Sequence, residues 1–441
     1  MISGILVLLF LGGGIVDLYV KNIYPRVFKS NCKQTVYVEF AGDNITDDFL
    51  LEIKIQPMEK YSILHTSKYR IDEEERYDYM PLKKCGDGIY CAEYNFACEQ
   101  QYSLKIKNNG TLIRNTHIYA LESDLAALKA FKGDTHLHTC RSDGEGTPFE
   151  VSCAYRGSGY DFIAVTDHHK FLPSLEAQSE IKVLTDQFYV FRGEEVHNKD
   201  MGYFHIINFN GESSVNDIIE TDDAYVESEI ERILSTHDFT GLSDPRCVAY
   251  RIFVAEHIHK ANGVAIMAHP FWEVFGEYHM QTEEFIYHWQ NGHFDALEVI
   301  AGCDGTGNGN NLQEMLRCDM LAEGYKIPVV GSSDAHTTNP KVATDRFNRQ
   351  FTIVFAKDFD DIPNAIKNEY GVAIDRIDDV HFRAIGKFRY AKYARFLMEV
   401  FYPSYSQLCE QHSKALGERN VSKIKEAEAN IIDFKSKFFN I

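Results

Sequence analysis

The chain has 441 residues, and its 44% hydrophobic and 25% charged content is ordinary for a globular enzyme of two or three domains. Its 65 acidic and 45 basic residues give a formal net charge of −20, which repels polyanions and argues against extended nucleic-acid binding. Ten cysteines in a chain of this length make no dense disulfide framework, although Cys85, Cys91 and Cys98 are close enough for a disulfide in an exported protein.

Residues 1–16 are the first distinct segment and include the apolar run ILVLLFLGGGIV. The run resembles the hydrophobic part of a signal peptide, but no Lys or Arg precedes it and no small-residue cleavage motif is evident. It is also too short to span a bilayer, so we expect no stable membrane insertion. A terminal strand or an extension is the alternative. We expect a cytoplasmic protein, or an exported one if this segment acts as a signal.

Residues 17–125 are rich in β-forming residues. Short runs separated by Gly, Asn and Asp turns predict an antiparallel β-sandwich of immunoglobulin size, with strands near 35–40, 50–55, 88–94, 102–106 and 111–119. The region contains no cluster of metal-ligand residues. We therefore expect an accessory domain that packs against a catalytic domain or binds a sugar or protein.

Four strand-like segments between residues 126 and 386 end in metal-ligand side chains: GDTHLHT at 133–139, DFIAVTDHH at 161–169, AHP at 268–270 and GSSDAH at 331–336. His136 and His138 are two residues apart, and Asp334 and His336 repeat this spacing. Because residues i and i+2 of a strand point to the same side, each pair can reach a single ion.

Two more strand-like runs carry residues of this kind. The run 188–191 leads into Glu194 and Glu195, and the run 203–209 contains His205. A single buried histidine is most simply a core residue. Six strand ends that all carry imidazole or carboxylate groups instead indicate a hydrolytic metal centre.

Helical stretches separate the strands, at 148–158, 173–184, 249–262 and 311–324, and strands without ligands fit at 296–300 and 351–355. The alternation predicts parallel βαβ units. Side chains at the carboxyl ends of many parallel strands converge on one point only if the sheet closes. The sequence therefore predicts an α/β fold with a distorted (β/α) barrel over residues 126–386.

Two segments have no predicted part in the chemistry. The acidic insertion at 212–246 is either a loop that closes over substrate or a pair of surface helices. Residues 387–441 are expected to form a helical tail, which either docks on the barrel or mediates a homo-oligomer.

In their order and number, the motifs resemble those of the PHP (polymerase and histidinol phosphatase) family: D-x-H-x-H-T, S-D-G at 142–144, T-D-H, G-x-E, a lone strand histidine, A-H-P and S-D-A-H. The resemblance implies a distorted (β/α)7 barrel with a trinuclear site of zinc, manganese or iron that hydrolyses phosphate esters. Carried over residue by residue, it implies the metal ligands His136, His138, Asp143, His168, Glu195, His205, His269, Asp334 and His336. The G-x-E pattern selects Glu195 and leaves Glu194 as a supporting group or a competing ligand.

The residue types also support this chemistry by themselves. Imidazole and carboxylate groups hold hard or borderline divalent ions, and no cysteine pair has zinc-finger spacing. Clustered ions neutralise phosphoryl oxygens and lower the pKa of a bound water to about 7, so a metal-bound water or hydroxide is the expected nucleophile. Asp134 and Asp167 lie beside proposed ligands and are expected to accept imidazole N–H groups, or else to be solvated carboxylates at strand ends.

Candidate substrate contacts are less specific. Arg141, His169 and Lys170 lie on the ligand-bearing loops, where a cation would hold a phosphate dianion, although each is equally an ordinary surface charge. Glu298 lies near the end of a strand and either faces the pocket or forms an ion pair at the edge of the core. Five other histidines lie outside the motifs and are expected to be structural: His257, His259, His279, His288 and His293.

We therefore expect a metal-dependent phosphoesterase, a phosphatase that acts on a small phosphorylated metabolite with two to three divalent ions (Zn, Mn or Fe) per chain. One alternative is a phosphodiesterase or nuclease, which the net charge disfavours. Another is an inactive metal-binding regulatory or structural module. A degenerate site should lack ligands, whereas every position of the motif set is filled here.

Overall fold

The structure is a computed structural model that describes residues 8–11, 14–42, 50–59, 77–197, 205–302, 307–339, 347–378 and 380–441. The chain forms two compact units. The first comprises Met1–Leu128, Phe396–Phe401 and Asn430–Ile441, and the second comprises Lys129–Arg395 and Tyr402–Ala429. The domain limits expected from the sequence (1–16, 17–125, 126–386 and 387–441) stay a prediction.

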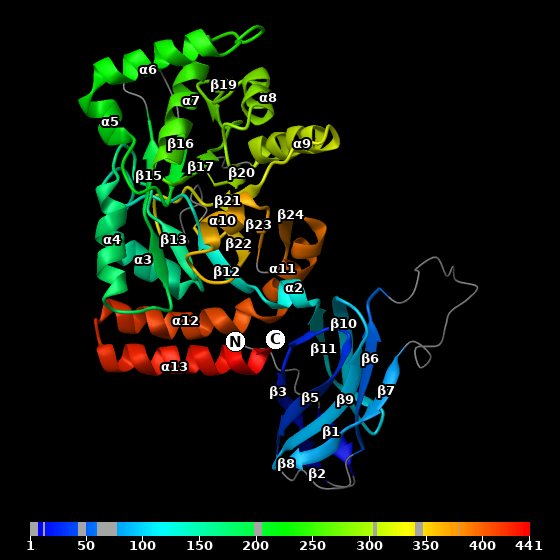
Figure 1. Cartoon of the computed structure of the whole chain (residues 1–441). Coiled ribbons are helices and arrows are strands. Elements are labelled where there is room, and N and C mark those ends of the chain that lie inside the picture. Colours follow the sequence, from blue (N-terminus) through cyan, green and yellow to red (C-terminus); the bar gives the residue numbers. More distant parts are fainter. Residues whose placement is uncertain are drawn as a thin grey trace. The chain divides into compact units, whose positions relative to one another are not determined.

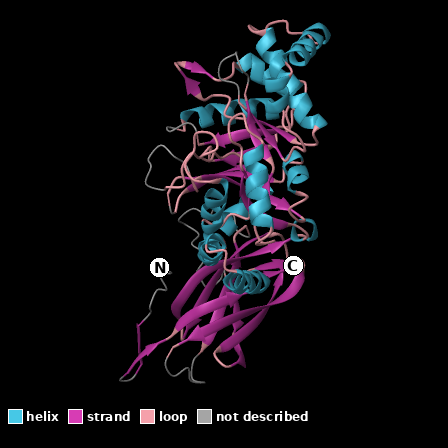
Figure 2. Cartoon of the chain, turned by 90° about the vertical axis from the view of Figure 1, so that its left-hand side faces the viewer, coloured by secondary structure: helices cyan, strands magenta, loops and turns pink. Residues whose placement is uncertain are grey.

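The first unit is built mostly of strands, which are the long arrows of Figure 2. Its elements are β1 (Leu8–Leu11), β2 (Gly14–Asp17), β3 (Tyr19–Tyr24), β4 (Val27–Lys29), β5 (Cys32–Ala41), β6 (Leu51–Pro57), β7 (Asp78–Pro81), β8 (Lys83–Gly86), β9 (Ile89–Phe96), β10 (Gln100–Asn108), β11 (Thr111–Leu121), the short helix α2 (Ser123–Ala126) and the terminal strand β25 (Phe439–Asn440). Strands β5, β6, β9, β10 and β11 cover the five runs that the sequence predicts.

Two sheets of this unit share one apolar core. One has the order β3-β5-β9-β8 and the other β25-β4-β11-β10-β6-β7. Along β10 every second residue is buried, which places Tyr102, Leu104 and Ile106 on the same face. Phe28 and Phe96 stack in the core with ring centroids 4.7 Å apart. Each buried side chain of this size stabilises the fold by roughly 1.5–3 kcal/mol.

Some features of this unit differ from the prediction. β4 pairs with β11 in parallel, and β25 pairs in parallel with β4, so the end of the chain adds a strand to the sheet and is not helical throughout. β1 and β2 form an antiparallel hairpin, which agrees with the strand alternative for the apolar segment. The rest of that segment, 1–7 and 12–13, lies outside the described residues.

The second unit alternates strands and helices (Figure 1). Its strands are β12 (Lys129–Asp134), β13 (Phe162–Ala164), β14 (Tyr189–Phe191), β15 (Gly193–Val196), β16 (Ile206–Phe209), β17 (Val264–Met267), β18 (Glu273–Val274), β19 (Glu277–Tyr278), β20 (Ala296–Ala301), β21 (Val329–Ser332), β22 (Gln350–Ala356), β23 (Gly371–Arg376) and β24 (Phe382–Gly386). Its helices are α3 (Pro148–Gly157), α4 (Leu172–Lys182), α5 (Asn216–Thr221), α6 (Asp223–Thr236), α7 (Pro245–Lys260), α8 (Thr282–Gln290), α9 (Asn308–Ala322), α10 (Ile362–Lys367) and α12 (Tyr402–Gly417). Two further helices, α11 (Phe388–Val400) and α13 (Val421–Phe438), belong to it only in part, because their last residues are assigned to the first unit.

The main strands of this unit form two sheets, with the orders β14-β13-β12-β22-β23-β24 and β15-β16-β17-β20-β21. Isolated parallel bridges join them, Leu137 to Ala335 and His168 to Glu195. Side chains from both sheets, among them Phe162 and Phe209, form a single apolar cluster. At Gly133 a Cβ would lie 2.0 Å from the Phe162 ring, so only glycine allows this approach. Closure of the two sheets into a barrel stays a prediction.

The strand directions correct the all-parallel expectation. β16 is antiparallel to both β15 and β17, and β22 is antiparallel to β12. Only nine residues (197–205) lie between β15 and β16, fewer than the dozen or more that a crossover to a parallel strand needs, so β16 runs the other way. His205 therefore lies at the start of its strand, and it still reaches the edge where the other ligands follow their strands.

The insertion and the tail are both helical. The insertion at 212–246 contains α5 and α6, so it matches the helix-pair alternative, and Figure 1 shows α6 beside α7. In the tail, α12 packs on α3, where a buried network joins Arg156 to His412 Nδ1 (2.9 Å) and to the Tyr405 hydroxyl (3.0 Å). Within the described residues, no helix combines the length and the apolar character that crossing a bilayer requires.

Candidate metal centre

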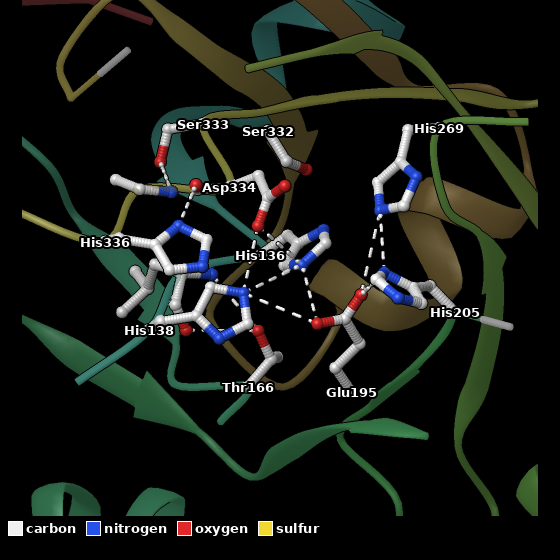
Figure 3. A network of polar contacts seen from close by, with 12 residues as sticks. His136, His138, Thr166, Glu195, His205, His269, Ser332, Ser333, Asp334 and His336 are labelled. Atoms are coloured by element: carbon white, nitrogen blue, oxygen red, sulfur yellow. Dashed lines mark hydrogen bonds and ion pairs between the residues drawn. The ribbon is translucent and has the colours of Figure 1, made fainter. Parts of the chain in front are cut away.

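All nine predicted ligands lie in the second unit, at the edge where its strands β12, β13, β17 and β21 end. His136 and His138 follow β12, and Asp334 and His336 follow β21. Backbone hydrogen bonds lock these two segments together, from His138 N to the Ala335 carbonyl (2.9 Å) and from Asp334 N to the His136 carbonyl (2.9 Å). The two i, i+2 pairs therefore face the same space, as Figure 3 shows.

Glu195 is the centre of the arrangement (Figure 3). Its carboxylate is fully buried, and its two oxygens face different imidazoles. Oε1 lies 2.6 Å from His205 Nδ1 and 3.7 Å from His269 Nε2. Oε2 lies 3.4 Å from the Nε2 atoms of both His136 and His138. A carboxylate placed in this way can bridge two ions.

Asp334 lies beside the pair of imidazoles that faces Glu195 Oε2, those of His136 and His138. Its Oδ1 lies 3.1 Å from His136 Nε2 and 2.9 Å from His138 Nε2. We call these three residues, together with Glu195, His205 and His269, the inner ligands. All six side chains are at most 10% exposed.

A second set of residues, the outer ligands, lies nearer the surface. Asp143 Oδ2 lies 3.4 Å from His168 Nε2 and 3.3 Å from His336 Nε2, and Asp143 Oδ1 lies 3.8 Å from His138 Nδ1. The side chains of Asp143, His168 and His336 are 52%, 21% and 38% exposed. The centre is therefore closed at the inner ligands and open at the outer ones.

The donor set fits divalent ions. Neither oxygen of Glu195 makes a hydrogen bond, and His138 Nδ1 and His269 Nδ1 are also buried without a hydrogen-bond partner. Burying a carboxylate in this way costs several kcal/mol unless a cation compensates it. Several combinations of side chains here bring their ligand atoms within 4.8 Å of one another, among them His138 with Asp143, His168 and His336; His136 with His138 and Asp334; His136 with His269 and Glu298; Glu195 with His205 and His269; and His168 with Glu195 and His197. Nitrogen and oxygen donors in this mixture suit zinc, manganese or iron.

Electrostatics favours the metal-binding form of some predicted ligands and not of others: although burial opposes it, the carboxylates of Glu195 and Asp143 raise the pKa of His168 to about 10. Burial pushes the pKa of the Glu195 carboxyl upward, but the surrounding imidazoles of His205, His136 and His168 together hold it well below its usual range. Burial also lowers the pKa of His205 to about 3, so its imidazole is neutral. A charged carboxylate and a neutral imidazole are the forms that coordinate an ion.

Two ligands are held in strained backbone conformations. His269 has φ 25° and Asp334 has φ 48°, both in the left-handed region that residues other than glycine rarely adopt. Such conformations cost on the order of 1–3 kcal/mol each and persist where the surrounding structure enforces them. The fold therefore fixes the positions of these two side chains in advance.

The structure resolves the choice between the two adjacent glutamates. Because they alternate along β15, only Glu195 points to the centre. Glu194 points away and accepts hydrogen bonds from the Val215 backbone (2.7 Å), the Ser214 hydroxyl (2.7 Å) and the Asn208 amide (2.9 Å). Glu194 therefore fixes the segment that follows β16.

The expected roles of Asp134 and Asp167 need correction. Asp134 accepts the backbone N–H groups of His136 and Ser333 (both 3.2 Å), and Asp167 accepts those of Thr139 (2.9 Å) and Ser142 (3.0 Å). Both carboxylates thus order ligand-bearing loops and not imidazoles. The reason is that each side chain points to backbone N–H groups of the loops that follow the strands, and not to an imidazole.

The carboxylate that does contact a ligand imidazole is Glu298. Its Oε1 lies 3.0 Å from His136 Nδ1, and its Oε2 accepts the backbone N–H of His269 (3.0 Å). Glu298 is fully buried, and its contacts with His136 and His269 place it at the site and not in an ion pair at the edge of the core. It fixes the orientation of one imidazole and the backbone of another.

The proposed substrate contacts have other partners in this structure. Arg141 pairs with Glu176 through two hydrogen bonds of 2.9 and 2.6 Å, and the Lys170 ammonium donates to the Arg141 carbonyl. His169 Nδ1 lies 3.8 Å from Glu220 Oε1. These groups lie on the surface near the outer ligands.

Two histidines that the sequence reasoning missed are part of the site. His197 Nε2 lies 2.6 Å from His168 Nδ1, and its spacing from Glu195 repeats the i, i+2 pattern, a signal that could have revealed it. His279, expected to be structural, packs its ring 5.2 Å from that of His205 and 5.1 Å from that of His269. Its Nε2 accepts the backbone N–H of His205 (3.2 Å).

Comparisons with known proteins give matches at the level of structure alone. No family model and no curated protein matches the chain. A two-domain protein from Bacteroides vulgatus, described as containing a predicted PHP-like metal-dependent phosphoesterase, is 19% identical, with 62% of this chain and 70% of that chain covered and a TM-score of 0.42. A putative metal-dependent phosphoesterase from Bifidobacterium adolescentis is 19% identical over 47% of this chain and 89% of that chain, with a TM-score of 0.34. An amidohydrolase from Chromobacterium violaceum with bound sulfate and no metal is 18% identical over 47% and 88%, with a TM-score of 0.32.

Proposed function

We propose that the chain is a metal-dependent phosphoesterase, a phosphatase that hydrolyses a small phosphorylated metabolite. The observation that carries this proposal is the Glu195 carboxylate, which is buried without a hydrogen bond between two sets of imidazoles. The nine predicted ligands would hold two to three divalent ions (Zn, Mn or Fe). The two sheets of the second unit would form the distorted seven-stranded barrel that presents them.

Bound ions would supply Lewis acidity toward the phosphoryl oxygens and lower the pKa of a water to about 7. The side chains have separate tasks. Glu195 and Asp334 would supply negative charge that offsets the charge of bound ions, and Glu298 holds His136 in one orientation. Asp167 holds the loop that carries Asp143, because it accepts the N–H groups of both Thr139 and Ser142.

The rise in side-chain exposure from the inner to the outer ligands supports a small phosphorylated substrate. The inner ligands are buried and the outer ligands are up to 52% exposed, so a phosphate group would approach from the side of Asp143 and His336. The overall charge of −20 opposes a long polyanion, whereas ions at the open edge would attract a single phosphate group.

The test is a screen of phosphomonoesters and phosphodiesters with protein loaded with Mn, Zn or Fe. We expect monoester hydrolysis that disappears in Glu195→Gln and persists in Glu256→Gln, a matched change on the surface of α7 that removes a partner of Arg232. Circular dichroism of both variants checks that the fold is retained. Turnover of diesters alone, or equal turnover by wild type and Glu195→Gln, would contradict the proposal.

A further inference from the structure

We propose that His197 is an additional metal ligand, which forms an ion position together with His168 and Glu195. This inference rests on the proposed function and deepens it, because the motif resemblance assigns no role to His197. The ion would be a divalent cation that accepts two imidazoles and a carboxylate, such as zinc, manganese, iron or cobalt.

The first observation is the placement of the His197 side chain. It follows Glu195 by two residues at the end of β15, so both side chains point to the same side of the strand. The Asn216 side-chain oxygen accepts the backbone N–H of His197 (3.2 Å), and the Asn216 side-chain nitrogen donates to the backbone carbonyl of Glu195 (3.0 Å). Asn216 thereby holds the backbone on both sides of Val196 and fixes where the His197 ring can lie.

The second observation is the convergence of three donor atoms. His197 Nε2 lies 2.6 Å from His168 Nδ1 and 3.6 Å from Glu195 Oε2, and His168 Nδ1 lies 2.7 Å from the same Glu195 oxygen. Donors around an ion with bonds of roughly 2.0–2.2 Å lie roughly 3.3–3.6 Å apart in a tetrahedral site. The spacing of His197 from Glu195 matches, and the two shorter distances to His168 would have to lengthen by roughly 0.6–1.0 Å around an ion.

Hydrogen bonding alone does not satisfy these three atoms. His168 Nδ1 has either one proton to donate or one lone pair to accept with, so at most one of its short contacts, with His197 Nε2 and with Glu195 Oε2, is a hydrogen bond, and Glu195 Oε2 makes no hydrogen bond. A cation between the three satisfies all of them at once. The side chain of His197 is only 15% exposed, so water gives little compensation.

The position is distinct from that of the outer ligands. His168 Nε2 faces Asp143 (3.4 Å), whereas His168 Nδ1 faces Glu195 and His197. The His197 ring also lies 4.1 Å from that of His205, which belongs to the inner ligands. His197 therefore extends the inner ligands toward the open edge of the site, next to where a phosphate group would enter.

The experiment is a titration of metal-free protein with Co²⁺, followed by visible absorption and by competition with a chelator. The variants are His197→Ala and His197→Gln, and the control is His381→Ala, whose side chain is 73% exposed in the same unit. We expect both His197 variants to bind one cobalt equivalent at least about tenfold more weakly and with an altered spectrum for that step. The control should match wild type.

An isotherm and spectrum of folded His197→Ala that equal those of wild type would overturn the inference. So would a change in KM or kcat with unchanged cobalt binding, because His197 would then act without touching an ion. Both results leave the proposed function intact. Failure of the wild-type protein to bind cobalt would instead refute the proposed function itself. If His197→Ala does not fold, His197→Gln, which keeps a hydrogen-bonding side chain, decides the question.

Discussion

The inner and outer ligands show two ways of holding the same residue types. The inner ligands are buried, sit on strand ends and include two residues with strained backbone, so their geometry is fixed by the fold. The outer ligands are exposed and lie on loops that depend on hydrogen bonds such as those to Asp167. If these residues bind metal as we propose, the inner positions should retain ions, and the outer edge should admit substrate and exchange ions more easily.

The largest expected effect follows from a change of Glu195, whose two carboxylate oxygens face the two pairs of inner imidazoles. Glu195→Gln keeps the shape of the side chain but removes the charge that offsets the ions. We expect the loss of at least one ion per chain and of detectable phosphatase activity, measured by elemental analysis and by turnover. If Glu195→Gln keeps full metal content, the inner ligands do not depend on a shared carboxylate and the comparison fails.

A smaller effect is expected at Glu298, which contacts a ligand but would not touch an ion. Glu298→Gln should weaken metal binding by about 10–100-fold while the protein stays folded, because His136 loses the charged partner of its Nδ1. Chelator competition measures the affinity, and Glu256→Gln is again the matched control. Unchanged affinity would mean that burial alone orients His136.

Asp143→Asn tests the outer ligands directly. Because Asp143 is half exposed, its loss should remove one weakly held ion and leave the inner ions in place. Elemental analysis after dialysis should show about one ion fewer than in wild type, and turnover should be restored in part by excess metal. Loss of all ions in Asp143→Asn would show that inner and outer positions are not independent.

The smallest effect is expected at Arg141, which is paired with Glu176 at the surface. Arg141→Ala should lower stability in thermal or denaturant unfolding only slightly, because solvent screens a surface ion pair, and should leave KM unchanged, because the guanidinium is already paired. A large rise in KM in Arg141→Ala but not in Glu176→Gln would show that the arginine leaves its partner to bind the phosphate group of the substrate.

The clustering of the two i, i+2 pairs, three inner residues and the outer His336, could be predicted because the information for it is local. His136 with His138 and Asp334 with His336 repeat the strand period directly after apolar runs, so both the site and its edge of the sheet follow from the sequence. The same rule applied to Glu195 would have drawn attention to His197. Which of the two adjacent glutamates points to the site could not be decided from the sequence, because the answer depends on which face of β15 meets the other predicted ligands.

Other features depend on contacts between distant residues and could not be read locally. An apolar strand such as β16 has the same pattern in either direction, so its antiparallel course had no signature around His205. Glu298 finds its partners 162 and 29 residues away in the sequence. His279 looked like an ordinary loop histidine, and only the fold brings it against His205.

The measurement that tests the central claim most directly is the metal content of the purified chain before and after reconstitution with Mn, Zn and Fe, compared with His269→Ala and Asp334→Ala. These two predicted ligands are 65 residues apart in the sequence and lie on opposite sides of Glu195, His269 near Oε1 and Asp334 near the imidazoles that face Oε2. The account predicts two to three ions per wild-type chain, fewer in both variants, and no hydrolysis by either variant although both remain folded. Less than one ion per reconstituted wild-type chain, or near-wild-type turnover in both variants, would contradict it.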